Sequence, residues 1–366
     1  MKDMGITFMH TNNQITPKER LQYLADGRPV DRLPVAISMG DAAKQLLTSH
    51  IHQNGTIAEN IAEVEIQTYK TFGVDGIELF YGLSTFAKVC GASMRVPPIG
   101  APLILQHPMK TLDDMDLICP EQFTVKKESN ASVLMDALRI IQEQIGDEVP
   151  CGIGFPGAFS IASSMLGIEK LLRSTRKEPE KLHLFLRRIN SALINLAADF
   201  LREDIPVDIA DPVASGTILH AKQFQEFVLP YAQEFVTACK KIRTYEIGCH
   251  ICGDTTKILD SMVDCGYDSL SLDNLVNLTT AKQMIGSRVP ISGNVPPVEV
   301  MLLGNPTQIK NAVIECFDQA GDSPCGFTIN TGCDCPPMTP MENITAYFEA
   351  ANRCAKFPYS KENLDW

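Results

Sequence analysis

The stretch Val207-Asp208-Ile209-Ala210 decides the fold, together with the polar loop from Asp211 and the helical pattern over Phe224–Ile242 that follow it. It is a short run rich in β-branched residues, placed before a loop and an amphipathic helix. The same unit recurs along the chain, and the runs that open it are short and largely apolar, which is typical of parallel strands buried on both faces. The eight runs are Leu33–Ser38, Gly76–Phe80, Cys151–Phe155, Val207–Ala210, Tyr245–His250, Asp268–Leu272, Val289–Ser292 and Gly326–Asn330.

Helical patterns lie between these runs. The clearest covers Glu180–Leu201, where apolar residues repeat at helical spacing from Leu182 to Phe200. Pro230 lies inside the pattern Phe224–Ile242 and predicts a kink or a break, because proline lacks the N–H that an interior helical position donates. Similar patterns cover Ile57–Phe72, Val133–Ile145, Thr255–Cys265, Ile309–Ala320 and Glu342–Lys356.

Eight strand–helix alternations in 366 residues predict an α/β fold, namely a (β/α)8 TIM barrel. A doubly wound open sheet is the alternative, and it predicts a glycine-rich phosphate loop after the first strand. The segment after Leu33–Ser38 is Met39-Gly40-Asp41-Ala42, which is not such a loop. We therefore expect a single barrel domain over residues 1–366, with an N-terminal extension over 1–30 and an elaborated loop region over about 81–150 that covers the carboxyl-terminal face.

The composition argues against several classes of function. Hydrophobic residues make up 45% of the chain and charged residues 21%, which is typical of a globular protein with a large core. The net charge is -12, and no stretch concentrates Lys and Arg, so we expect no nucleic-acid or membrane partner. Met1–Asn13 lacks the apolar centre of a signal peptide, so we expect a cytoplasmic protein whose twelve cysteines are reduced thiols.

Candidate metal ligands follow two of the predicted strands. In barrels of this kind the reactive residues lie where strands end and loops begin. His250 and Cys252 lie two residues apart at the end of the fifth run, so both side chains should face the barrel interior. Cys333 follows the eighth run, which lies across the barrel mouth from the fifth. One imidazole and two thiolates that converge there would suit zinc, with a fourth position open for substrate. The alternative is a hydrogen-bonded core histidine beside cysteines that only fill space.

Other polar residues follow further strands at the same rim. Asp211 and Asp273 are candidate catalytic residues that could contact substrate, orient His250 or complete the zinc site. Each could equally cap a helix or order a loop. Gly293 and Asn294 are candidates for binding a cofactor, since a glycine lets the backbone approach a ligand closely, and an ordinary turn is the alternative.

Several segments resemble the uroporphyrinogen decarboxylase superfamily, and the resemblance extends from Thr16 to about Ala355. Two motifs are similar to the corrinoid methyltransferase branch of that superfamily, namely His250-Ile251-Cys252-Gly253 and Thr331-Gly332-Cys333. The superfamily segments are Asp211-Pro212-Val213-Ala214-Ser215, Phe224-Gln225-Glu226-Phe227-Val228-Leu229-Pro230-Tyr231, Gly248-Cys249-His250-Ile251-Cys252-Gly253 and Ser292-Gly293-Asn294-Val295.

The resemblance implies a (β/α)8 barrel with one catalytic zinc ion, which His250, Cys252 and Cys333 would hold. The chain departs from the branch at Cys335, where an aliphatic residue is expected. It also departs from the decarboxylase branch in Arg32–Asp41, which lacks the two arginines that bind substrate carboxylates there. These departures argue against porphyrinogen decarboxylation.

The implied activity is the transfer of a methyl group between a corrinoid (cobalamin) and a small-molecule thiol, methyl ether or methylamine, as part of anaerobic one-carbon metabolism. The chain has no D-x-H-x-x-G segment for holding cobalamin, so we expect a separate corrinoid-binding protein as partner. A homodimer is one candidate assembly, and the sequence does not decide the oligomeric state. A decarboxylase or lyase of the uroporphyrinogen decarboxylase type, or a barrel that only binds a small molecule, is the alternative.

Overall fold

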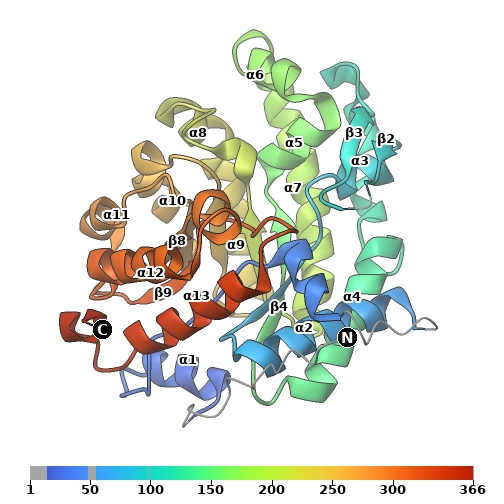
Figure 1. The fold of residues 1–366 in the computed structure, drawn as a ribbon. Helices are drawn as coiled ribbons and strands as arrows, with labels where there is room; N and C mark the ends of the chain where they lie inside the picture. The colour runs from blue at the N-terminus through green and yellow to red at the C-terminus, as the bar shows by residue number, and fades with distance from the viewer. Residues whose placement is uncertain (1–14, 48–54, 98, 366) are drawn as a thin grey trace.

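Seven parallel strands form one curled sheet that is surrounded by helices (Figure 1). The computed structural model describes residues 15–47, 55–97 and 99–365, so residues 1–14 of the predicted N-terminal extension lie outside the described part. The strands pair in the order β1-β4-β5-β6-β7-β8-β9. Their bounds are β1 (Ile77–Phe80), β4 (Cys151–Pro156), β5 (Val207–Ala210), β6 (Gly248–Ile251), β7 (Ser269–Leu272), β8 (Ile291–Val295) and β9 (Phe327–Thr331).

The predicted first strand, Leu33–Ser38, contributes a single bridge to this sheet rather than a full strand, which corrects the prediction. Val35 forms a parallel bridge with Ile329 of β9, and the Ala36 N–H donates to the Ile329 carbonyl at 2.9 Å. On the other side, the Asp75 N–H donates to the Val35 carbonyl at 3.1 Å. Pro34 has no N–H to donate, which limits the pairing along this segment. The segment nevertheless lies between β9 and the start of β1 and so closes the barrel.

The predicted helices are present, with two changes. The pattern over Phe224–Ile242 is divided into two helices, and Pro230 lies in the first turn of the second, so the predicted break is confirmed. The pattern over Thr255–Cys265 is divided into two short helices. The helices are α1 (Pro17–Ala25), η2 (Gly40–Leu47), α2 (Ile57–Phe72), α4 (Ser129–Ile145), α5 (Ala158–Leu166), α6 (Ile168–Lys177), α7 (Pro179–Arg202), η5 (Pro212–Ala214), α8 (Ala221–Phe227), α9 (Leu229–Ile242), η6 (Thr256–Ile258), α10 (Leu259–Asp264), α11 (Leu278–Ile285), η7 (Pro297–Leu302), α12 (Pro306–Ala320), α13 (Met341–Cys354) and η8 (Lys361–Leu364).

The region 81–150 holds several elements between β1 and β4. Its last part is α4, which packs against α2 and β4 as an ordinary barrel helix. Figure 1 shows the β2–β3 hairpin and α3 beside α5, at the end of the molecule where α6 and α8 also lie. The elements before α4 are α3 (Thr85–Val89), β2 (Ser93–Arg95), β3 (Leu103–Gln106), η3 (Leu112–Leu117) and η4 (Pro120–Gln122).

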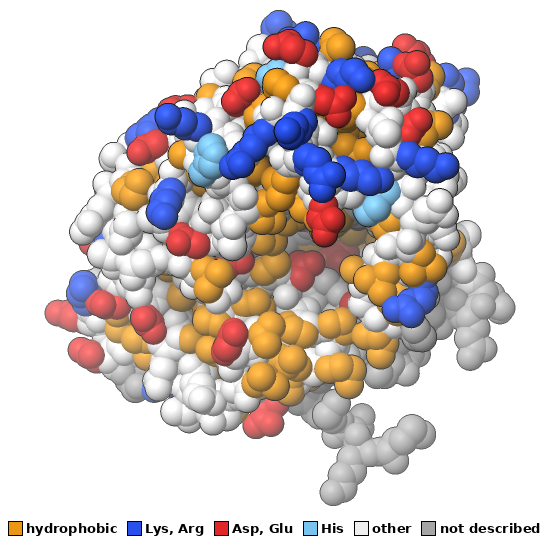
Figure 2. Space-filling view, turned by 90° about the horizontal axis from the view of Figure 1, so that it is seen from above, with side chains coloured by type: hydrophobic (Ala, Val, Ile, Leu, Met, Phe, Trp, Pro, Cys, Tyr) orange, Lys and Arg blue, Asp and Glu red, His pale blue; other side chains and the backbone are white. Residues whose placement is uncertain are grey.

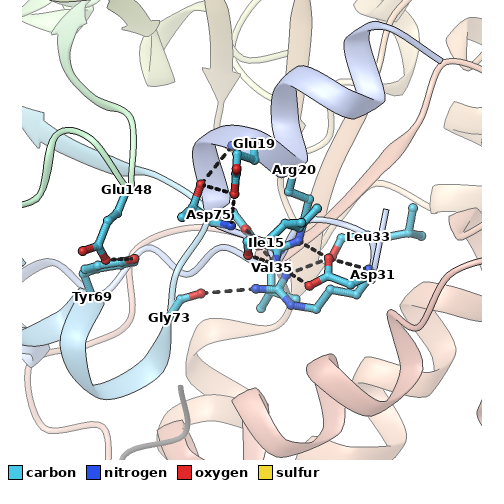
Figure 3. A network of polar contacts seen from close by, with 12 residues as sticks. Ile15, Glu19, Arg20, Asp31, Leu33, Val35, Tyr69, Gly73, Asp75 and Glu148 are labelled. Atoms are coloured by element: carbon cyan, nitrogen blue, oxygen red, sulfur yellow. Dashed lines mark hydrogen bonds and ion pairs between the residues drawn. The ribbon is translucent and has the colours of Figure 1, made fainter. Parts of the chain in front are cut away.

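A buried charge network joins α1 to the barrel beside the Val35 bridge (Figure 3). The guanidinium of Arg20, which is fully buried, pairs with Asp31 at 2.7 Å and with Asp75. Asp75 also pairs with Arg32 and accepts the Val35 N–H at 2.7 Å. One buried carboxylate therefore binds two arginines and the segment that closes the barrel.

No helix in the described ranges is long and apolar enough to cross a membrane. All twelve cysteines lie in those ranges and carry free thiols.

Candidate metal centre

The structure brings His250, Cys252 and Cys333 together at the carboxyl end of the barrel. His250 lies in β6, Cys252 follows directly after that strand, and Cys333 follows β9. One ligand atom from each residue lies within 4.8 Å of the other two. The Cys252 Sγ lies 3.3 Å from the His250 Nε2 and 3.8 Å from the Cys333 Sγ. Residues from two strands that lie far apart in the sequence thus meet at one point.

These separations fit a tetrahedral zinc site. With a Zn–N bond of about 2.0 Å and Zn–S bonds of about 2.3 Å, a tetrahedron places nitrogen and sulfur about 3.5 Å apart and two sulfurs about 3.8 Å apart. The observed 3.3 Å and 3.8 Å differ from these values by a few tenths of an ångström or less. Two of the three donor separations therefore match a tetrahedral zinc site, the third lies within 4.8 Å, and three protein donors leave a fourth position for substrate.

Neighbouring groups orient the imidazole of His250 for metal binding. Its Nδ1 lies 3.2 Å from the backbone carbonyl oxygen of Ser271 and 3.2 Å from the Ser271 hydroxyl. A carbonyl can only accept, so Nδ1 carries a proton, and Nε2 is the nitrogen that faces the sulfur atoms. Ser271 is the residue of β7 that lies in register with His250, so the strand pairing itself positions this acceptor.

The two thiols share a hydrogen bond that separates their protonation states. Hydrogen bonds from Cys252 and then from His250 lower the pKa of Cys333 to about 4. The same hydrogen bond, together with burial, raises the pKa of Cys252. Cys333 is therefore a thiolate at neutral pH, which is the form in which cysteine binds a metal ion.

The third cysteine of this region, Cys335, lies away from the cluster. Its side chain is buried, and its N–H donates to the Ser38 carbonyl at 2.7 Å. Burial raises the pKa of the Cys335 thiol to about 12, so the thiol stays protonated. Within the part of the chain that the structure describes, one cluster of three or more potential ligands could hold a metal ion, namely His250, Cys252 and Cys333.

Asp211 binds the start of a helix. Its carboxylate accepts the Ser160 N–H at 2.8 Å and the Ser160 hydroxyl at 2.6 Å, and Ser160 lies in the first turn of α5. A Cβ at Gly157 would lie 2.3 Å from this carboxylate, so only glycine fits there. Burial raises the pKa of Asp211 to about 6. These contacts match the capping alternative, although the capped helix follows β4 rather than Asp211 itself.

Asp273 supports the loop that carries Cys252. Its carboxylate accepts the N–H of Gly253 at 2.8 Å and that of Leu275 at 2.9 Å. Gly253 has a φ of +82°, which other residues rarely adopt. Because Gly253 follows Cys252 directly, Asp273 helps to fix the position of that ligand.

Gly293 and Asn294 join β8 to the neighbouring loop. Gly293 has a φ of +140°, and a Cβ there would lie 2.7 Å from the Leu272 carbonyl. The Asn294 amide donates to the carbonyls of Asp273 at 2.9 Å and Val276 at 2.7 Å. Both residues thus hold the backbone around Asp273, and the cofactor contact predicted for them stays a prediction.

The barrel interior is hollow and polar, a feature that the sequence pattern does not predict. In several strands the residues facing the helices are buried, whereas the alternate, inward-facing residues are partly accessible to solvent. Branched apolar side chains usually fill this space. Figure 2 shows the molecule hollowed near its centre, with acidic side chains inside the hollow. The accessible inward residues are Glu78, Phe80, Gly152, Asp208, Ala210, Gly248, His250, Ser269, Ser271, Ser292, Thr328 and Asn330.

Two carboxyl groups of this interior, Glu78 in β1 and Asp208 in β5, are hydrogen-bonded to each other. The sequence pattern presents the runs Gly76–Phe80 and Val207–Ala210 as largely apolar strands. The signal that could have identified these residues is one acidic side chain inside each otherwise apolar strand, since a strand buried on both faces has no place for a charge.

Comparisons with known proteins agree with this fold. The family model described as uroporphyrinogen decarboxylase (URO-D) matches residues 16–354. A methylcobamide:CoM methyltransferase, MtaA of Methanosarcina barkeri, is 25% identical over 348 residues, which cover 92% of this chain and 98% of that protein. A uroporphyrinogen decarboxylase of Alkalilimnicola ehrlichii is 27% identical, covering 93% of this chain and 94% of that protein.

A solved methyltransferase from Methanosarcina mazei superposes with a TM-score of 0.78 at 25% identity, covering 93% of this chain and 99% of that one. The predicted barrel fold is thereby confirmed. Since the family model spans nearly the whole sequence, this chain belongs to the uroporphyrinogen decarboxylase family.

Proposed function

We propose that this protein is a zinc-dependent methyltransferase that moves a methyl group between a corrinoid, carried by a separate protein, and a small-molecule thiol, methyl ether or methylamine. The observation that carries the proposal is the convergence of His250, Cys252 and Cys333 within 4.8 Å, in a geometry that suits tetrahedral zinc. The name of the Methanosarcina barkeri relative, a methylcobamide:CoM methyltransferase, supports the corrinoid and thiol parts of the proposal.

Several residues around the site would each contribute to binding and activating a substrate. Zinc bound there would keep a thiol ionised at neutral pH or polarise the heteroatom of a methyl donor. His250 offers Nε2 because Ser271 fixes its tautomer. Contacts with Cys252 and His250 lower the pKa of Cys333, which favours the thiolate that binds a metal ion. Asp273 holds the backbone next to Cys252. The open interior beneath these ligands gives a small substrate room to bind from the barrel mouth.

Family membership alone would also allow decarboxylation of a porphyrinogen, since decarboxylases are among the relatives. Two features of this chain disfavour that reaction. The interior presents Glu78 and Asp208, which would repel a substrate that carries several carboxylates. In addition, the accessible inward positions of the described strands hold no Lys or Arg to pair with such carboxylates.

The test is to measure zinc and methyl transfer in the same preparation. Protein purified under reducing conditions should contain about one equivalent of zinc, which His250→Ala and Cys252→Ser should lose while circular dichroism stays unchanged. Cys325→Ser, which removes an exposed cysteine outside the cluster, should keep the metal. Methylcobalamin should be demethylated by some member of a panel of thiols, or formed from cob(I)alamin and a methyl ether or methylamine.

Retention of zinc in both ligand variants would refute the metal site. A protein with one zinc ion that transfers no methyl group in either direction would refute the methyltransferase activity and leave the metal site intact.

A further inference from the structure

We propose that Glu78 and Asp208 form the inner end of the substrate site, which we call the floor, below the metal centre. They select a substrate whose end away from the metal, its far end, is cationic or donates a hydrogen bond, over a substrate whose far end is anionic. The inference rests on the proposed function, because it takes His250, Cys252 and Cys333 as the point where the reacting heteroatom binds. It goes further by naming the chemistry at the other end of the substrate.

The strand register places Asp208 below the metal ligands. Ala210 of β5 lies in register with His250 of β6, and the Gly248 N–H donates to the Asp208 carboxylate at 2.5 Å. Asp208 and Gly248 therefore lie two residues before Ala210 and His250 on their strands. Two residues of a strand span about 7 Å, and side chains two apart face the same side. The Asp208 carboxylate thus lies about one layer of side chains deeper in the same hollow as His250.

Glu78 reaches the same point from two strands away. β4 lies between β1 and β5, and a Cβ at Gly154 of β4 would lie 2.5 Å from the Glu78 Oε1. The missing side chain leaves the space in which Glu78 crosses β4 and hydrogen-bonds to Asp208. Solvent nevertheless reaches Glu78, so a ligand that enters from the mouth can reach it too.

Glu78 and Asp208 together provide a negatively charged hydrogen-bond acceptor about one layer of side chains below His250. Enclosure by the surrounding barrel and then the charge of Asp208 raise the pKa of Glu78, and desolvation raises that of Asp208, so the two groups share a proton rather than both ionising. The remaining negative charge has no Lys or Arg beside it among the accessible inward positions of the described strands. An ammonium or hydroxyl group at this depth would gain a charge-assisted hydrogen bond, whereas a sulfonate or carboxylate would be repelled.

The metal centre is an independent observation in the same hollow that points to a bound ligand, because three protein donors leave a fourth position open. A substrate held there by its heteroatom and extending inward would bring its other end to the pair. We therefore assign the substrate class as small molecules with a thiol or methylated heteroatom at one end and an amine, hydroxyl or amide at the other.

The experiment measures thiol binding to cobalt-loaded protein, without turnover. Cobalt(II) replaces zinc in N/S sites, and a bound thiolate gives a charge-transfer absorption band. The probes are 3-aminopropane-1-thiol, 3-mercaptopropan-1-ol and 3-mercaptopropane-1-sulfonate, which have the same chain length and differ in their far end. At low ionic strength the aminothiol should bind at least about tenfold more tightly than the sulfonate, since the negative pair would attract its ammonium group and repel the sulfonate in a partly enclosed site.

Variants of Glu78 and Asp208 test whether these two carboxyl groups, and not the rest of the site, cause the preference for the aminothiol. Glu78→Gln/Asp208→Asn removes the charge and should bring the ratio of the two affinities close to one. Each single variant leaves one carboxyl group, which ionises without its neighbour, and should keep most of the wild-type ratio. Asn at position 208 keeps an oxygen to accept the Gly248 N–H. The control Asp136→Asn, on the exposed face of α4, should leave the wild-type ratio unchanged.

Three outcomes would count against the idea, and they differ in what they overturn. Equal affinities for the aminothiol and the sulfonate in the wild type, or an unchanged ratio in the double variant, would refute the selective floor and leave the metal centre intact. A protein that takes up no cobalt would overturn the proposed function and this inference together.

Discussion

Asp75→Asn should destabilise the protein strongly, because Asp75 joins the barrel closure to two arginines. The Asp75 side chain is 3% exposed and pairs with Arg20 and Arg32, whose side chains are 0% and 6% exposed. Removing one partner of a buried ion pair costs about 3–5 kcal/mol, because it leaves a buried charge without compensation. Asp31 still pairs with Arg20 at 2.7 Å, so we expect a loss near the lower end of that range.

The measurement is the free energy of unfolding from urea titration at neutral pH. Asp136→Asn is the matched control, since Asp136 and Arg139 form an exposed pair at 3.4 Å and should contribute about 1 kcal/mol or less. Hydrogen exchange gives a local readout, because the Ala36 N–H that bonds to Ile329 should exchange faster in Asp75→Asn. A loss no larger than that of the control, with Ala36 still protected, would refute the idea that Asp75 holds the closing segment.

Three further outcomes are expected. His250→Ala should lower zinc affinity by about 100-fold or more, measured by competition with a chelator, whereas Cys325→Ser should not change it. Asp211 has a pKa of about 6 in the folded protein against an ordinary value of 3.8, so its carboxyl group binds a proton more tightly when folded. Its contribution to stability is therefore greatest below about pH 4 and falls by about 3 kcal/mol as the pH rises to about 6, a slope in urea titrations that Asp211→Asn should remove. Gly253→Ala should weaken zinc binding and reduce the melting temperature, because a Cβ there would lie 2.6 Å from the Ser215 hydroxyl. Gly326→Ala, at a φ of +109° with no atom within 4 Å of the added Cβ, is the control for the cost of backbone conformation alone.

Local sequence patterns are sufficient to predict the repeating strand–helix units and the three residues of the candidate metal site. Alternation along a strand is a local property, so the spacing of His250 and Cys252 was enough to place both side chains on one face. The break at Pro230 is local for the same reason, since proline removes a hydrogen-bond donor wherever it occurs. Placing Cys333 opposite them required the additional prediction that eight units close into a barrel.

Only the tertiary structure decided which groups meet across strands. Glu78 and Asp208 are 130 positions apart, and their contact depends on the stagger of three strands and on the absence of a side chain at Gly154. Likewise, Asp211 caps a helix that precedes it by about fifty residues. Local patterns specify the direction of a side chain, but its partner depends on how the whole barrel closes, and the energy of each contact exists only after that closure.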